Sequence, residues 1–182
     1  MRVIAGTARS IPLVCPAGEN TRPTTDRIKE TLFNVIQFEV EGTVFVDLFA
    51  GSGAVGIEAL SRGAQKAYFI DNNNNSVSCI ETNLKKTKLT DKALVLKQDS
   101  ITAISYSIRE NIDILFVDPP YGQGLDRTTL EACRNCKYVT EDTLIIVEEN
   151  ADTDFSYAEE LGYAIEKVKL YKTNKHVFLR KQ

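Results

Sequence analysis

The chain has 182 residues, of which 43% are hydrophobic, and its formal net charge is −3 with a pI of about 5.3. This length suits a single domain over residues 1–182, and the acidic balance gives no general indication of a nucleic-acid-binding protein. No stretch approaches the roughly 20 apolar residues that span a bilayer, and no signal peptide is recognisable. We therefore expect a cytoplasmic monomer without a membrane partner.

Positive charge gathers at the two ends of the chain. Residues 163–182 carry six cations against Glu166 alone, and residues 1–37 carry five cations against three acids. This distribution fits ordinary solvated charge, and it also fits end segments that contact phosphate groups.

The four cysteines are Cys15, Cys79, Cys133 and Cys136. Cys133 and Cys136 form a C-x-x-C, but no second pair and no nearby histidine completes a zinc site. We expect reduced cysteines that act as small buried hydrophobes, and no metal.

The first 42 residues are expected to form an extension before the main fold. Two short apolar runs near the N-terminus predict a small β-hairpin. A helix then begins at Pro23 or at one of the two threonines after it, and apolar residues at helical spacing would pack it on the core. This packing would leave Arg22, Arg27 and Lys29 at or near the polar face.

The main fold, residues 43–182, opens with a strand, a glycine turn, a helix and a second strand. Residues 43–49 are nearly all β-branched or aromatic, as in a strand covered on both faces. Glycines follow in G-x-G-x-x-G spacing from Gly51, and Asp71 ends the second strand. Such a unit binds a nucleoside in the crevice beyond the strand ends.

Strands and helices continue to alternate along the chain. Further strands are expected at residues 67–70, 93–96, 112–117, 143–147, 164–170 and 175–179, and helices at 76–87, 101–109, 125–136 and 155–161. This pattern predicts an α/β class with a Rossmann-like, seven-stranded, mostly parallel sheet and an antiparallel C-terminal hairpin.

The glycine spacing alone is weak support for any one cofactor. Asp71 lies 20 residues after Gly51, close to the spacing of a ribose-binding carboxylate. Asp47, inside the strand before the turn, would repel a pyrophosphate but attract an amine. S-adenosylmethionine carries an amine and a sulfonium and has no phosphate, so Asp47 favours it over nicotinamide. Asp47 can also hydrogen-bond to the glycine loop.

The tetrapeptide Asp118-Pro119-Pro120-Tyr121 ends the fourth strand, beside the glycine loop in a doubly wound sheet. Methylation of an exocyclic amine needs acceptors for both N–H groups, and the Asp118 carboxylate and the Pro119 carbonyl can provide them. The prolines stiffen the turn, and Tyr121 offers a flat face for an extruded base. Taken alone, Asp-Pro-Pro is also common turn chemistry.

The candidate site residues follow from these positions. The expected cofactor-binding residues are Asp47, Phe49, Gly51, Gly53, Asp71, Asn72, Asp99 and Ser100. Asp99 is about equally well explained as the cap of the helix that follows it.

Four blocks of the sequence resemble the RsmD family of bacterial 16S ribosomal RNA guanine-N2 methyltransferases. They are RVIAG at residues 2–6, TRPTTDRIKETLFN at 21–34, the glycine block at 46–64 and DPPY at 118–121. The glycine block alone would indicate only a class I methyltransferase, whereas the block at 21–34 is specific to the family.

The resemblance implies S-adenosylmethionine-dependent methylation of N2 of guanine 966 in 16S rRNA, on the small ribosomal subunit. It implies that Asp118–Tyr121 are catalytic and that Arg22, Pro23, Thr24 and Arg27 lie by the mouth of the active site and bind substrate. The chain departs from the usual pattern of the RsmD family at two places. The family has a basic run after the first Ala-Gly, where this chain has only Arg9, and the second strand commonly ends in glutamate, where this chain has Asp71.

Other functions stay open at this point. A methyltransferase acting on adenine N6 would share the tetrapeptide, and a non-catalytic ribosome-assembly factor could keep the fold. A chain of this length has no room for a separate DNA-recognition domain, and a protein glutamine methyltransferase would be expected to carry Asn in place of Asp118. A nicotinamide oxidoreductase is disfavoured by Asp47.

Overall fold

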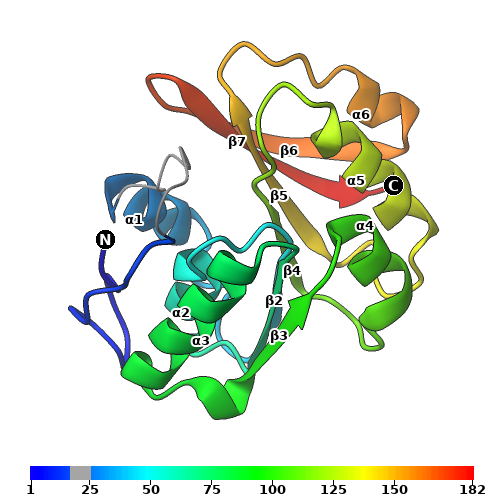
Figure 1. The fold of residues 1–182 in the computed structure, drawn as a ribbon. Coiled ribbons are helices and arrows are strands. Elements are labelled where there is room, and N and C mark those ends of the chain that lie inside the picture. Colours follow the sequence, from blue (N-terminus) through cyan, green and yellow to red (C-terminus); the bar gives the residue numbers. More distant parts are fainter. Residues whose placement is uncertain (17–25) are drawn as a thin grey trace.

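The computed structural model describes residues 1–16 and 26–182, and its centre is a seven-stranded sheet with helices on both faces (Figure 1). The strands are β1 Val44–Asp47, β2 Lys66–Asp71, β3 Ala93–Lys97, β4 Ile114–Val117, β5 Leu144–Asn150, β6 Tyr163–Leu170 and β7 Asn174–Lys181. The helices are α1 Asp26–Val35, α2 Ala54–Ser61, α3 Asn74–Thr87, α4 Ser100–Thr102, α5 Leu125–Asn135 and α6 Tyr157–Glu160, with short helical turns at Thr90–Lys92 and Ala103–Ser107. No described helix has the length and apolar character needed to cross a membrane.

The strand order is β3-β2-β1-β4-β5-β7-β6. The five strands β1 to β5 are parallel, and β7 runs antiparallel between β5 and β6. The predicted α/β class, the seven strands and the antiparallel C-terminal hairpin are thus confirmed. Because β1 lies between β2 and β4, the chain reverses its direction of winding there, which leaves a crevice at the carboxyl ends of these strands.

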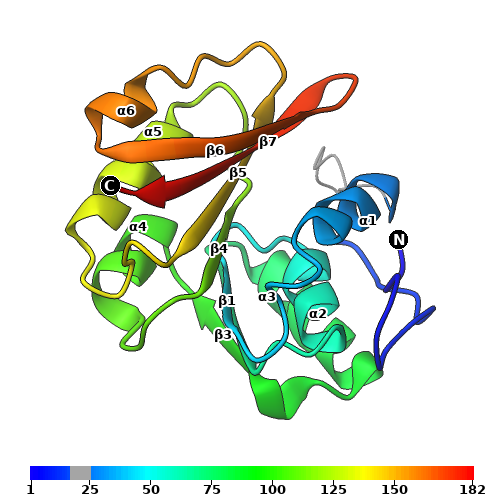
Figure 2. The same ribbon diagram turned by 180° about the vertical axis from the view of Figure 1, so that it is seen from behind.

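Strand residues alternate between two cores, one on each face of the sheet. Phe45 and Phe116 pack under α1, α2 and α3, whereas Val46 and Leu115 pack under the helical segments that follow β3, β4 and β5. Figures 1 and 2 show these two groups of helices on opposite sides of the sheet. Both faces are covered, which explains why the strands read as continuous apolar runs.

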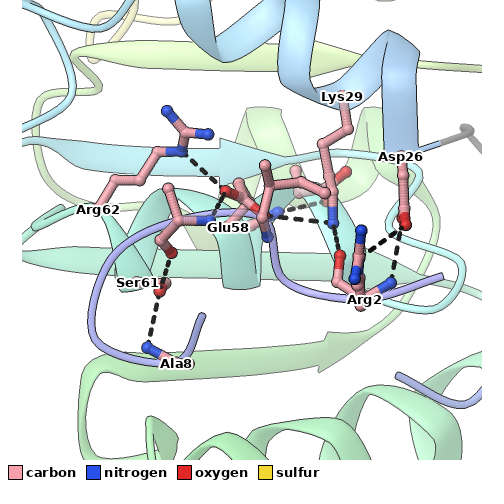
Figure 3. Close-up of polar contacts among 11 residues, drawn as sticks. Arg2, Ala8, Asp26, Lys29, Glu58, Ser61 and Arg62 are labelled. Atoms are coloured by element: carbon pink, nitrogen blue, oxygen red, sulfur yellow. Dashed lines mark hydrogen bonds and ion pairs between the residues drawn. The ribbon is translucent and has the colours of Figure 1, made fainter. Parts of the chain in front are cut away.

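The N-terminal segment is less regular than predicted. The two apolar runs pair, but the only bridge among the described residues of this segment joins Arg2 and Pro12. The segment is instead held to α2 by Glu58 and Ser61. The Glu58 carboxylate accepts the Ile4 N–H at 2.8 Å and the Ala5 N–H at 3.0 Å (Figure 3). Ser61 accepts the Thr7 N–H at its carbonyl and the Ala8 N–H at its hydroxyl, which donates to the Ala5 carbonyl.

Two cations complete the surroundings of Glu58. Lys29 Nζ on α1 lies 3.3 Å from the carboxylate, and Nε of Arg62, the residue that directly follows α2, lies 2.8 Å from it. Lys29 also donates to the Arg2 carbonyl at 2.7 Å, and its side chain is fully buried, as is that of Glu58. The placement of Lys29 on a polar face was therefore wrong: its charge is neutralised inside the protein and joins α1 to α2.

Two further expectations need correction. The expected helix at residues 101–109 is one short turn followed by a π-helical turn, Ala103–Ser107. Cys79, Cys133 and Cys136 are buried as predicted, but Cys15 is exposed.

Replacement of Glu58 by Ala should lower the free energy of unfolding by about 3–5 kcal/mol, because it leaves Lys29 buried without a carboxylate and two backbone N–H groups without acceptors. Glu131→Ala is the matched control, since Glu131 forms the same i,i+4 pair with Arg127 but both side chains are about half exposed (49% and 52%). The Glu131→Ala variant should lower the free energy of unfolding by at most about 0.5 kcal/mol. Urea unfolding of both variants tests this, and equal losses would contradict the assigned role of Glu58.

Candidate active site

A cavity of about 900 Å³ lies at the carboxyl ends of β1, β2 and β4. Each of these strands brings one carboxylate to it: Asp47 ends β1, Asp71 ends β2 and Asp118 directly follows β4. The parallel register aligns the three strand ends, so residues far apart in the sequence line one hollow.

The glycine loop between β1 and α2 forms one wall of the cavity. Gly53 has a φ of 75°, which a side chain would make unfavourable. A Cβ at Gly56 would lie 2.4 Å from the Phe69 ring, so only glycine lets α2 approach β2 this closely. The loop is held by Asp71, which accepts the Gly51 N–H at 2.9 Å through one oxygen and the Asn73 N–H at 2.9 Å through the other.

Asp47 is the most deeply buried acid of the cavity, with 2% of its surface exposed. It accepts the Gly56 N–H at 3.2 Å, so the structural bond to the glycine loop is present. The pKa of Asp47 is raised to about 7, chiefly by burial and to a smaller extent by the nearby charge of Asp71, while the Gly56 hydrogen bond lowers it. Ionisation of Asp47 is therefore costly unless a cation binds beside it.

The charged side chains among the described residues that line the cavity are all acidic. Four carboxylates line it, those of Asp47, Asp71, Asp99 and Asp118. Among its described lining residues there is no lysine, arginine or histidine. Such a lining suits a cationic ligand without phosphate and does not suit a pyrophosphate.

The Asp118–Tyr121 turn forms the opposite wall. Burial raises the pKa of Asp118 well above its ordinary value, and the charges of Glu148, Asp47 and Glu149 raise it further. The Tyr121 hydroxyl donates to Glu148 Oε1 at 2.8 Å, and burial raises its pKa, so it stays protonated.

Most of the predicted site residues meet at this cavity. Those that line it are Asp47, Phe49, Gly51, Asp71, Asn72, Asp99, Ser100, Asp118, Pro119, Pro120 and Tyr121. Gly53 shapes the loop without lining the cavity, and Asp99 also caps the next helix by accepting the Thr102 N–H at 3.0 Å. Arg27 is exposed on α1 outside the lining, and Arg22, Pro23 and Thr24 lie outside the described residues.

Part of the cavity lining was not predicted from the sequence. Met1, Cys15 and Pro16 of the N-terminal segment border the cavity. Asn83 on α3 holds this segment by accepting the Val14 N–H at 2.9 Å, and it donates to the Ser52 carbonyl of the glycine loop at 2.9 Å. The position of Asn83 on the apolar face of a predicted helix was the one indication in the sequence that its side chain bonds to another segment.

The sheet order, the antiparallel seventh strand and the cavity at the switch point define the class I methyltransferase fold. Residues 1–179 match the sequence model of the family described as conserved hypothetical protein 95, and the chain belongs to this family, the RsmD family.

Relatives and solved structures agree with this membership. Ribosomal RNA small subunit methyltransferase D of Escherichia coli K12 is 34% identical over 154 residues, 84% of this chain and 76% of that one. YlbH of Bacillus subtilis is 36% identical over 156 residues, 85% of each chain. The solved structure of Escherichia coli yhhF aligns with a TM-score of 0.85 and 28% identity, covering 100% of this chain and 98% of the other.

Asp47→Asn should stabilise the ligand-free protein at pH 8, by roughly 3–4 kcal/mol, and leave it little changed at pH 4. A carboxyl whose pKa is raised on folding binds more protons in the native state, so wild-type stability falls as the pH rises from about 4 to about 7. The amide cannot ionise and escapes this loss. Urea unfolding at both pH values tests the prediction, and a variant less stable than wild type at pH 8 would contradict it.

Proposed function

We propose that this protein transfers a methyl group from S-adenosylmethionine to N2 of a guanine in 16S rRNA of the small ribosomal subunit, the nucleotide at position 966 by family resemblance. The observation that carries the proposal is a cavity with four carboxylates and no lysine, arginine or histidine among its described lining residues, next to the Asp118–Tyr121 turn. Relatives at 33–34% identity that are named ribosomal RNA small subunit methyltransferase D support the rRNA substrate.

The cofactor would occupy the cavity between the glycine loop and the Asp118 turn. When bound, it supplies an electrophilic methyl group on a sulfonium. Asp47 would attract the positively charged end, the backbone around Gly51 would face the ligand closely, and Asp71 would accept the ribose hydroxyl groups. Each Asp71 oxygen accepts one backbone N–H, so a lone pair remains on each.

The Asp118–Tyr121 turn would hold the target amine. The Asp118 carboxylate and the Pro119 carbonyl would accept its two N–H groups, which turns the nitrogen lone pair toward the methyl group at roughly 3–3.5 Å. Tyr121 would stack on the extruded base. A bound cation lowers the pKa of a neighbouring carboxyl, so cofactor binding would favour the ionised form of Asp118 that this role requires.

The RNA contacts would come from cations that remain exposed. In the C-terminal hairpin, Lys175 donates to the Thr153 carbonyl at 2.5 Å, Arg180 pairs with Glu39 and Glu166, and Lys181 donates to three carbonyls. Lys167, Lys172 and Arg27 are exposed. Phosphate contacts from these side chains would position the substrate without reading its sequence.

Incubation with tritiated S-adenosylmethionine and small subunits that lack the modification should yield N2-methylguanine in 16S rRNA. Nuclease digestion and chromatography of the nucleosides identify the labelled base. Label in N6-methyladenine would support the adenine alternative, and absence of label despite subunit binding would support a non-catalytic assembly factor; either result would refute the guanine assignment.

Asp118→Ala should lower turnover by at least about 100-fold, because Asp118 would act on the target amine. The affinity for the cofactor should change little. Calorimetry with the cofactor and single-turnover label transfer separate the two effects. Asp99→Ala, which removes a carboxylate from the cofactor side of the same cavity, should instead weaken cofactor binding and retain turnover at saturating cofactor. Loss of cofactor binding in a folded Asp118→Ala variant would show that the acceptor role is wrong.

A further inference from the structure

A chain of buried polar side chains runs behind Tyr121. The Tyr121 hydroxyl donates to Glu148 Oε1 at 2.8 Å, and Glu148 Oε2 lies 2.8 Å from His176 Nε2. Asn174 donates to Glu148 Oε1 at 2.6 Å, and the Tyr171 hydroxyl lies 2.9 Å from His176 Nδ1. None of these residues except Tyr121 lines the cavity.

Antiparallel pairing of β5 and β7 builds this chain. Glu148 on β5 and His176 on β7 are direct partners in the register, so the backbone places their side chains together. Glu148 is 4% exposed and His176 is completely buried. The His176 ring also meets Phe116, Tyr171 and Phe178 edge to face, at centroid distances of 6.0, 5.1 and 6.4 Å. These contacts leave the imidazole little freedom to change its direction.

The hydrogen-bond directions follow from the charge of Glu148. Burial alone would raise the pKa of Glu148, but the hydrogen bond and charge interaction with His176, together with the hydrogen bonds from Tyr121 and Asn174, outweigh it and hold the pKa below its ordinary value. An ionised carboxylate only accepts, so His176 donates from Nε2.

Burial of a carboxylate is costly, and an apolar pair would join β5 to β7 without this cost. An apolar pair, however, could not accept the hydrogen bond from Tyr121. With this bond the tyrosine is fixed at its backbone by the proline-rich turn and at its hydroxyl by Glu148.

We infer that Glu148 and His176 are positioning residues, which act through the Tyr121 hydroxyl to fix the direction of the ring against which the target base stacks. This inference rests on the proposed methyl-transfer function. It assigns a role to the lone histidine of the chain, which the cofactor and the amine do not use.

The kinetic test compares His176→Leu and His176→Gln, each alone and combined with Tyr121→Phe. His176→Leu should lower kcat about tenfold, the equivalent of one buried hydrogen bond, with KM for the cofactor unchanged. His176→Gln keeps a donor near Nε2 and should restore most of kcat. In the Tyr121→Phe background, which itself should lower kcat about tenfold, neither change at His176 should have a further effect.

Tyr163→Phe is the matched control for Tyr121→Phe, because it also removes one tyrosine hydroxyl. The Tyr163 hydroxyl donates to the Leu130 carbonyl at 2.7 Å on the other face of the sheet. The Tyr163→Phe variant should leave kcat unchanged. An equal loss of kcat from His176→Leu with and without the Tyr121 hydroxyl would overturn the inference, as would an unchanged kcat in His176→Leu.

A substrate-independent measurement separates this inference from the proposed function. NMR relaxation of ¹³C-labelled tyrosine, with the Tyr121 signal assigned through Tyr121→Phe, should show a lower order parameter for Tyr121 in His176→Leu than in wild type. An unchanged order parameter would overturn the inference, whether or not the wild-type protein transfers label. A wild-type protein that transferred no label would refute the proposed function but not the positioning of the Tyr121 ring.

Discussion

The position of β1 between β2 and β4 is the constraint on which the site depends. Parallel pairing on both sides brings the ends of three strands to one edge, and the acids Asp47, Asp71 and Asp118 with them. Because neighbouring strands lie about 4.8 Å apart, these carboxylates are forced to share a small volume. Burial raises the pKa of Asp47 and of Asp118, and neighbouring negative charges raise both further, so ionisation in the ligand-free site has a cost that a cationic ligand relieves.

Two buried glutamates then connect this edge to the rest of the molecule. Glu58 lies on the helix that follows the glycine loop and joins it to the N-terminal segment and to α1 through Lys29. Glu148 lies on β5 and joins the Asp118 turn to the C-terminal hairpin through His176. A buried carboxylate is stable only when its oxygens are satisfied, so each glutamate requires its neighbours to hold one arrangement. The glycine-loop side and the Asp118-turn side of the cavity are thereby each tied to an end of the chain.

Features that depend on a short pattern were predictable from the sequence. Continuous apolar runs identified the buried strands, and the glycine spacing located the loop before α2. The environment of a side chain was harder to predict where two environments suited it. Lys29 was expected on a polar face but is buried against Glu58, because the helical period does not say which charged residue finds a partner. Asp99 lines the cavity and caps a helix as well, so the two alternatives were not exclusive.

The order of elements and the residues at strand ends were readable in advance, since they depend on neighbours within a few positions and on general rules for parallel sheets. Contacts between distant segments were not. Glu148 and His176 are 28 residues apart, and their meeting depends on the register of β5 and β7, in which a shift of one residue would turn either side chain to the other face. The hydrogen bond from the Val14 N–H to the Asn83 side chain likewise joins residues 69 positions apart. Local patterns therefore located the acids of the cavity, whereas packing between remote strands and helices decided how the turn at Tyr121 is held.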